Sequence, residues 1–351
     1  MEKLLKIGIT HGDINGVSYE IILKILADNR ILDCCIPIIY GSPKVFAFYK
    51  KMFDLNNLNY TIVKSVAEAY GKRIYVINCC SDEIKVEVGK QMPETGVFAL
   101  NALDAATADL RAGKIDAMVT APINKSAMQS DKFNFPGHTE YLEKAAGNQS
   151  IMMLVSDSVR VALATNHVPV SKISEKLTKE LILRKLQLLH KSLMQDFSIT
   201  CPRIAVLGLN PHASDNGLLG SEEQEIIKPA IDAANVQGIA CTGPLSADGF
   251  WGSGAFAQYD AILAMYHDQG LAPFKALFQD SGVNFTGGLP FVRTSPAHGT
   301  AYNLAGKNAA NPSSFLQALY MAIDIVKNRA RYKEISANPL KVEVEMVEEK
   351  I

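Results

Sequence analysis

The sequence lacks several features that mark other classes of protein. No apolar run approaches the ~18 residues that a membrane-spanning helix needs. The net charge is −1, from 35 basic and 36 acidic residues, and no basic run with interleaved aromatic residues is present. Linkers rich in proline and serine, internal repeats and low-complexity tracts are also missing. We therefore expect a soluble globular enzyme that binds neither membrane nor nucleic acid.

The sequence also lacks the patterns that are typical of disulfide-bonded and of exported proteins. The six cysteines include no CxxC motif, and they are Cys34, Cys35, Cys79, Cys80, Cys201 and Cys241. Two adjacent pairs cannot easily form local bridges, so reduced thiols are favoured. The first residues, MEKLLKIGIT, contain no small-residue cleavage site and run into a first strand-like segment. These observations predict a cytoplasmic protein.

Apolar strand-like runs alternate with longer helical patterns along almost all of the 351 residues. The first pair is KIGIT followed by SYEIILKILAD, and the last helix is expected near SSFLQALYMAIDIVKNRA. Such alternation predicts an α/β fold with a largely parallel sheet. Because single cores stop growing at roughly 250 to 300 residues, the length predicts two lobes.

Three histidines each end a short apolar run: His167 in VALATNH, His212 in IAVLGLNPH and His267 in AILAMYH. Ligands of open α/β sheets bind outside the carboxyl ends of the strands, so three imidazoles arriving there would meet over one crevice. Three histidines also leave one coordination position of a zinc-like ion open for substrate. The alternative is three ordinary histidines satisfied by local backbone. Their shared context favours a catalytic metal site.

The segment MVTAPINKSAMQSDKFNFPGHTEYL, residues 118–142, predicts an anion-binding turn. A strand ends in Thr-Ala-Pro and is followed by Asn124-Lys125-Ser126, where free backbone N–H groups and a lysine can receive an anion. His138 and Thr139 precede another helical stretch. The alternative is that Thr139 only caps that helix and His138 is a surface residue.

Residues 265–295 contain a second set of cationic and polar side chains. Lys275 follows His267 by about two helical turns, and Asn284 and Arg293 bracket a glycine-rich stretch. Lysine as a point charge and arginine as a planar fork together suit phosphate or carboxylate. They predict an anionic substrate beside the metal, the alternative being a solvated lysine and a structural arginine.

Dinucleotide and nucleotide fingerprints are not convincing. The string from Gly252 to Ala257 matches GxGxxG/A, but no strand precedes it, so a loop is expected. A Walker A sequence is absent. His11 ends the first strand-like run, where it lines the crevice or serves the core or a loop.

Seven motifs together resemble the 4-hydroxythreonine-4-phosphate dehydrogenase family of vitamin B6 biosynthesis, over nearly the whole chain. They are TAPINK, FPGHTEYL, ATNHVPV, LNPHASDNG, AMYHDQGLAPFK, GVNFTGGLPFVRTS and HGTAYNLAG. The resemblance implies a homodimer with an isocitrate/isopropylmalate dehydrogenase-like fold and an active site at the subunit interface. Two interleaved lobes would share a mixed, largely parallel sheet with helices on both faces. We expect residues 1–130 with 295–351 to form the NAD side, and 131–294 the metal, substrate and dimer side.

The resemblance also implies ligands for particular residues. One divalent metal per active site would bind His167, His212 and His267, with ligands from both subunits; zinc is the first choice, with Mg, Mn, Co and Ni as alternatives. The small phosphorylated substrate would be held by His138, Thr139, Lys275, Asn284 and Arg293. HGTAYNLAGKN is similar to the adenine-side NAD loop of the decarboxylating dehydrogenases, which would place near the cofactor His298, Gly299, Thr300 and Asn303. Asn303 stands where isopropylmalate dehydrogenases have an aspartate that binds the ribose hydroxyls. A neutral amide would reject a 2′-phosphate less strongly than a carboxylate, so NADP is an alternative to NAD.

The implied reaction is NAD-dependent oxidation of 4-phosphohydroxy-L-threonine to 2-amino-3-oxo-4-phosphooxybutanoate, which decarboxylates to 3-amino-2-oxopropyl phosphate. His138, Lys275 and Asp248 are the candidates for its acid or base. A related branch that oxidises 4-phospho-D-erythronate or 4-phospho-D-threonate is the alternative, and an acyltransferase or a non-catalytic phosphometabolite-binding protein lies further off. The first turn departs from the family, with Thr-His-Gly-Asp at 10–13 in place of Thr-Pro-Gly-Glu.

Overall fold

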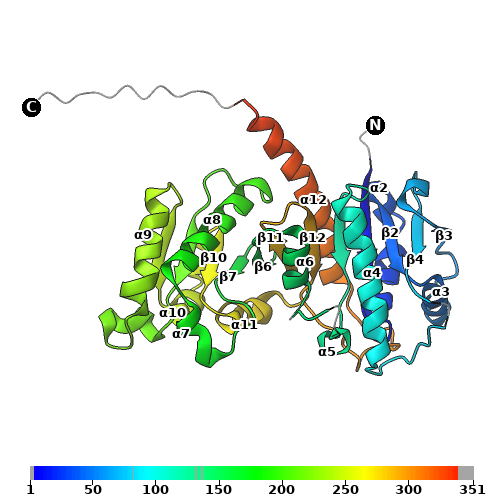
Figure 1. The fold of residues 1–351 in the computed structure, drawn as a ribbon, viewed down its shortest axis with the longest axis horizontal. Coiled ribbons are helices and arrows are strands. Elements are labelled where there is room, and N and C mark those ends of the chain that lie inside the picture. Colours follow the sequence, from blue (N-terminus) through cyan, green and yellow to red (C-terminus); the bar gives the residue numbers. More distant parts are fainter. Residues whose placement is uncertain (1–3, 82, 131–132, 136, 339–351) are drawn as a thin grey trace, which may run out of the picture.

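The computed structural model describes residues 4–81, 83–130, 133–135 and 137–338, and their strands form one twelve-stranded sheet. Its order is β3-β4-β2-β1-β5-β12-β11-β6-β7-β10-β8-β9 (Figure 1). The strands are β1 (Leu5–Thr10), β2 (Cys35–Gly41), β3 (Tyr60–Val63), β4 (Ile74–Asn78), β5 (Ala117–Thr120), β6 (Ile151–Val155), β7 (Arg160–Leu163), β8 (Ile204–Leu207), β9 (Cys241–Leu245), β10 (Ala261–Ala264), β11 (Val283–Gly287) and β12 (Val292–Pro296).

The sheet is mixed and mostly parallel, as the alternating pattern predicts. Three central pairings are antiparallel: β12 with β11, β11 with β6, and β6 with β7. On either side of this centre the strands run parallel, including the adjacent trio β7, β10 and β8. Figure 1 shows the strands and helices of the first 80 residues at one end of the molecule and α8 and α9 at the other.

Helices pack against both faces of the sheet. They are α1 (Ser18–Leu26), α2 (Ile31–Cys34), α3 (Pro43–Met52), α4 (Pro93–Arg111), α5 (Lys125–Met128), α6 (His138–Ala146), α7 (Ile173–Lys176), α8 (Lys179–Gln195), α9 (Lys228–Val236), α10 (Ala247–Gly252), α11 (His267–Phe278) and α12 (Ser313–Ile335). In the described part of the chain, none of these helices combines the length and apolar character that a bilayer span requires.

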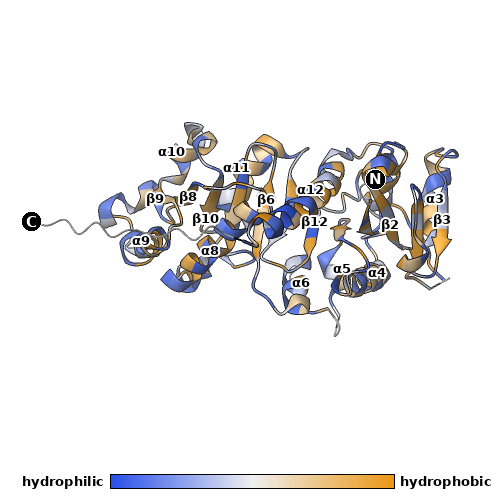
Figure 2. Ribbon diagram, turned by 90° about the horizontal axis from the view of Figure 1, so that it is seen from above, coloured by the Kyte–Doolittle hydropathy of each residue, from blue (hydrophilic) through white to orange (hydrophobic). Residues whose placement is uncertain are grey.

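Alternation along the strands divides the core between the two faces. Every second side chain along a strand, such as Ile204 and Val206 of β8, points to the same face of the sheet. These side chains form one cluster that extends across the whole sheet under α1, α3, α8, α9 and α12. The side chains between them, such as Ala205 and Leu207, join one of two separate clusters on the opposite face. Figure 2 shows the apolar residues concentrated along the strands.

The two separate clusters leave a cleft between them over the central strands. One contains α4 and α6 with β2, β4 and β5, and the other contains α10 and α11 with β6, β7, β8 and β10. The registers place Arg293 of β12 beside Met118 and Asn284 of β11 beside Leu154, so both polar side chains lie on this face. A polar floor between two apolar clusters is a suitable position for a ligand site. The predicted lobe boundaries at 130 and 295 stay a prediction, and residues 339–351 of the second segment lie outside the described residues.

Candidate functional site

A cavity of about 240 Å³ lies over the polar floor of the cleft. Its walls come from the turn after β5, the first turn of α6, the loop after β7, one side of α11 and the segment after β12. The lining includes most of the residues predicted for substrate, metal and cofactor, namely His138, Thr139, His167, His267, Lys275, Asn284, Arg293, His298 and Gly299.

Arg293 forms the floor of the cavity and is 2% exposed. Its Nη2 and Nε donate to Thr120 Oγ1 at 2.6 and 3.0 Å, and its Nη1 donates to Thr286 Oγ1 and Asn284 Oδ1 at 3.3 and 3.4 Å. These oxygens are neutral, and burial lowers the pKa of the guanidinium to about 9. A buried cation without a contacting carboxylate is costly unless an anion binds beside it. The absence of a contacting carboxylate therefore favours an anionic ligand for Arg293 over a purely structural role.

His138 is the first residue of α6, and its Nδ1 lies 3.0 Å from Arg293 Nη2. A guanidinium has only donors, so Nδ1 must accept, and the neutral ring carries its proton on Nε2. Burial, reinforced by Arg293 and Lys125, holds the pKa of His138 well below its usual range, which keeps the ring neutral. The Nε2 atom is buried and has no hydrogen-bond partner in the described structure. His138 thus offers an unpaired N–H donor and is not the surface residue of the alternative interpretation.

Thr139 is buried in the first turn of α6, but it does not cap the helix. The N-cap is Gly137, which has no side chain to occupy the first backbone N–H groups. These groups and the positive end of the helix dipole face the cavity, since Gly137 and Thr139 both line it. Lys275, on α11 as predicted, adds an exposed cation from the opposite wall.

His167 and His267 meet at the cavity, with ring centroids 5.9 Å apart. His167 Nδ1 lies 2.9 Å from Glu140 Oε1, and His267 Nδ1 lies 2.6 Å from Asp268 Oδ1. A carboxylate at Nδ1 orients an imidazole so that Nε2 can bind a metal. His167 Nε2 lies 3.3 Å from Lys125 Nζ. Two of the three predicted ligands therefore have the partners of metal-binding histidines.

His212, the third predicted ligand, is exposed and does not line this cavity. It follows β8, the neighbour of β10 in the sheet, as expected. The chain then turns through five consecutive left-handed residues, from His212 (φ 54°) to Asn216 (φ 57°), none of them glycine. Such a conformation is unfavourable and occurs mainly at functional sites.

The buried carboxylate of Glu223 holds the base of this turn. Its Oε1 accepts from the backbone N–H groups of Leu209 and Asn210, both at 2.7 Å, and its Oε2 accepts from Asn210 Nδ2 at 2.9 Å. Over the described ranges, no group of three or more His, Cys, Asp or Glu side chains could hold a metal ion. One chain by itself therefore does not complete a three-histidine site.

The remaining predicted residues, Asp248, Thr300 and Asn303, do not line the cavity. Asp248, on α10, is exposed, bonds to Ser246 and lies outside the cavity lining. Thr300 is part of the loop after β12 and packs against Gly16, while Asn303 further along the loop is exposed. The Gly252–Ala257 string ends α10 and enters a short 3₁₀ turn, so no strand precedes it, as predicted.

Thr120 and Glu140 of the cavity were not assigned roles from the sequence, and Lys125 was predicted only to receive an anion. Lys125 follows a turn that predicts anion binding, but its contact with His167 depends on a pairing across 42 residues. Glu140 stands two residues after His138 in HTEYL, and a carboxylate in that first helical turn is the signal that could have identified it. Nothing local distinguishes Thr120 from other strand threonines.

The buried histidines predict that stability falls as the solution is acidified. Burial lowers the pKa of His11 to about 4 and lowers those of His138 and His298. Below the unfolded value of 6.5 the unfolded chain takes up protons that the folded chain refuses, so unfolding becomes more favourable between that pH and the folded pKa. His11 alone should remove about 3 kcal/mol by the end of this range.

Urea unfolding measured between about pH 8 and about pH 4.5 checks this expectation. The slope below pH 6.5 should become smaller in His11→Asn, which cannot titrate. An identical slope in the wild type and the variant would contradict the contribution of His11.

The fold and the cavity first define a class: an α/β protein with a candidate anion-binding cavity at the carboxyl ends of its parallel strands. A sequence model of the family described as pyridoxal phosphate biosynthetic protein PdxA matches residues 33–322. The chain belongs to this family. The acyltransferase alternative loses its support, because relatives that match the chain over nearly its full length are named as dehydrogenases.

Two relatives and one solved structure illustrate the similarity. A 4-hydroxythreonine-4-phosphate dehydrogenase of Bacteroides thetaiotaomicron is 56% identical over 97% of this chain and 94% of its own length. A putative D-threonate 4-phosphate dehydrogenase of Oceanobacillus iheyensis is 37% identical over 94% of this chain and 100% of its own. The crystal structure of a 4-hydroxythreonine-4-phosphate dehydrogenase from Klebsiella pneumoniae covers 93% of this chain and 99% of its own, with 32% identity and a TM-score of 0.79.

Proposed function

We propose that the protein oxidises 4-phosphohydroxy-L-threonine with NAD to 2-amino-3-oxo-4-phosphooxybutanoate, which loses CO₂ to give 3-amino-2-oxopropyl phosphate on the route to pyridoxal 5'-phosphate. The observation that carries the proposal is Arg293, a buried cation without a contacting carboxylate at the floor of a cavity that also holds His167 and His267. It supports an anionic substrate placed beside a metal-binding pair. The similarity to named 4-hydroxythreonine-4-phosphate dehydrogenases supports the substrate.

The substrate phosphate is assigned to the cations and free donors of the cavity. Arg293 presents a planar fork, and the N–H groups at the start of α6, beside Gly137 and Thr139, add neutral donors. His138 donates through Nε2, since its Nδ1 already accepts from Arg293. Lys275 and Asn284 close the site from α11 and β11.

Proton transfer is the second task of the cavity residues. Loss of hydride from the C3 carbon requires that the C3 hydroxyl give its proton to a base. His138 is poorly placed for this task, because its free nitrogen carries the proton, and Asp248 lies outside the cavity of its own chain. Of the three candidates from the sequence, Lys275 is the one that keeps a place in the cavity as a possible base.

A divalent metal, zinc by preference, would make the C3 hydroxyl more acidic and NAD would accept the hydride. The residues present fit a metal in part: His167 and His267 are oriented by carboxylates, and the imidazole of His212, in the strained turn, would be the third donor. Because one chain does not bring His212 to the other two, we assign it to the cavity of a second subunit. The working form would then be a homodimer.

We assign NAD to two cavities that share the lining residue His298. His298 lines both the substrate cavity and a second one of about 180 Å³, whose walls include Val17, Leu304, Ala310 and Asn311. Its Nε2 is buried without a hydrogen-bond partner in the described structure. The nicotinamide end would occupy the first cavity and the adenosine end the second, next to Thr300 and Asn303.

The six cysteines are free, which supports a reducing cytoplasm as the location of the protein.

NADH formation from NAD, followed with 4-phosphohydroxy-L-threonine, 4-phospho-D-erythronate and 4-phospho-D-threonate, tests the proposal. The amino acid should be turned over, and a chelator should stop the reaction. Preference for a sugar acid would move the protein to the alternative branch, for which the similarity to a putative D-threonate 4-phosphate dehydrogenase is the specific observation. Turnover on none of the three would leave a binding protein. Undiminished activity after complete removal of metal would contradict the metal assignment.

A further inference from the structure

The loop that runs from His298 to Asn311 lies against the altered first turn and α1. Val17 N donates to Thr300 O at 3.0 Å. A Cβ atom added at Gly16 would lie 2.6 Å from the same oxygen, so the two backbones are in direct contact. The loop is thus built on a segment nearly 300 residues away in sequence, and its position depends on that segment.

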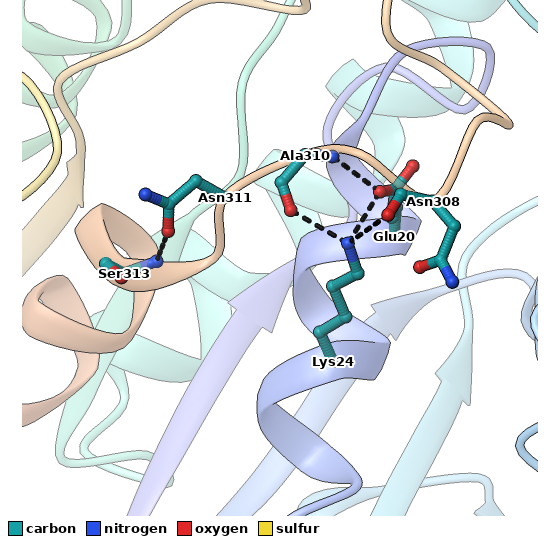
Figure 3. Close-up of polar contacts among 6 residues, drawn as sticks. All are labelled: Glu20, Lys24, Asn308, Ala310, Asn311 and Ser313. Atoms are coloured by element: carbon teal, nitrogen blue, oxygen red, sulfur yellow. Dashed lines mark hydrogen bonds and ion pairs between the residues drawn. The ribbon is translucent and has the colours of Figure 1, made fainter.

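One anchor of the loop is an ion pair on α1 (Figure 3). Lys24 Nζ donates to Asn308 O at 3.1 Å and to Ala310 O at 2.8 Å, and it pairs with Glu20 Oε1 at 2.8 Å. The same Glu20 oxygen accepts from Ala310 N at 2.7 Å. The pair therefore holds both backbone polar groups of Ala310.

A second anchor joins the loop to the substrate side. Tyr302 Oη donates to Asp13 Oδ2 at 2.6 Å and accepts from Asn124 Nδ2 at 2.9 Å. Asn124 in turn accepts from the backbone N–H groups of Ser126 and Ala127 and so caps α5, beside the anion-binding turn. The loop is fixed at two points, one near Tyr302 and one at 308–310.

The first anchor has a large desolvation cost, so it contributes little to the stability of the protein. The Glu20 side chain has 0% exposure, and its Oε2 has no hydrogen-bond partner in the described part of the chain. Burying such a pair typically gains less than apolar packing of the same volume, so its value lies in the geometry that it imposes. The geometry it imposes is that of Ala310, which also lines the second cavity.

We propose that Glu20 and Lys24 are positioning residues for the dinucleotide. They hold the 308–310 end of the loop in the form that lines the second cavity, so that the cofactor binds a preformed surface and does not have to order it. The proposal rests on the proposed NAD-dependent function. It predicts an effect on cofactor binding that is not shared by the phosphorylated substrate.

Lys24→Met in the full chain tests the proposal. The dissociation constant for NAD, measured by calorimetry, should rise about tenfold, the equivalent of about 1.4 kcal/mol of lost preorganisation. The KM for NAD should rise with it, while kcat and the KM for the phosphorylated substrate stay within about twofold. Amide hydrogen exchange should accelerate in 308–311. Lys228→Met is the matched control, because Lys228 forms an i,i+4 pair with Asp232 on α9, outside both cavities.

The outcomes separate cleanly. If Lys24→Met binds NAD with unchanged affinity, the proposal is overturned even if amide exchange accelerates. If the affinities for NAD and for the phosphorylated substrate fall equally, the pair has only a structural role, and the proposal is overturned as well. If Lys24→Met does not fold, Lys24→Arg should give the same selective loss at smaller size, since a planar fork cannot reach both carbonyls and Glu20 in the same directions. Failure of the wild-type protein to bind NAD would instead contradict the proposed function itself.

Discussion

Replacing Arg293 with methionine is expected to abolish tight binding of the phosphorylated substrate without destabilising the protein. In the folded chain the guanidinium is buried against hydroxyl and amide oxygens, and burial lowers its pKa to about 9. An apolar side chain of similar length avoids that desolvation cost but leaves the oxygens of Thr120 and Asn284 without their donor, so the free energy of unfolding should change little. The substrate phosphate, by contrast, loses its buried cation.

Losing one partner of a buried charge pair costs about 3 kcal/mol, or roughly a hundredfold in affinity. Calorimetry with substrate, and thermal unfolding with and without inorganic phosphate, measure the two effects. Phosphate should raise the Tm of the wild type but not of Arg293→Met. Arg293→Lys should recover part of the affinity, because it keeps the charge and loses the fork.

A matched arginine distinguishes anion binding from general effects of burial. Arg160 of β7 is also partly buried with a lowered pKa, but it packs on the Phe197 ring and lies outside the cavity. Arg160→Met should leave the response to phosphate intact. An Arg293→Met protein that still gains stability from phosphate would show that the anion binds elsewhere.

The sequence predicted the places where strands end better than the way the chain leaves them. Apolar runs located β7, β8 and β10, and the parallel rule correctly put their carboxyl ends on one edge. His267 then starts α11, so its position follows from the strand. His212 lies five residues beyond β8 and begins a left-handed turn, residues 212–216, that contains no glycine and no proline. That turn depends on Glu223, a contact that no local pattern reveals.

The central strands show a second limit. The apolar runs of the sequence did not include β11 and β12, and no local pattern could show that Arg293 and Asn284 face a cleft between two clusters. Their role depends on which helices cover each part of the face. β6 and β7 depart from the largely parallel pattern and form an antiparallel hairpin through Ser156, whose side chain accepts from Val159 N.

The first turn shows a third limit. His11 and Asp13 are among the residues in which this chain departs from the family pattern, and the sequence could not say what they contact. His11 lies in the core, with Nδ1 at 3.1 Å from Tyr19 Oη and Nε2 at 3.1 Å from Phe98 O. Asp13 binds Tyr302, a residue 289 positions away. Long-range pairs of this kind are invisible to local patterns.

His267→Ala and His212→Ala are each expected to lose the bound metal, and turnover should fall by more than about a hundredfold, beyond the loss typical for an outer-shell partner. Metal content after dialysis, measured by mass spectrometry beside NADH formation, checks both effects. His190→Ala is the control, since His190 lies on α8 outside the cavity. Retained metal in either histidine variant would exclude that residue as a ligand.

Mixing the two inactive variants tests whether the site is shared between subunits. If His212 of one chain joins His267 of its partner, a dimer of one His212→Ala chain and one His267→Ala chain contains one site with both changes and one intact site. Random exchange makes half of the dimers mixed, so about one quarter of wild-type turnover should return. If all three histidines served a site within one chain, every site would carry one change and no activity would return. The isolated position of His212 in the single chain favours the first result.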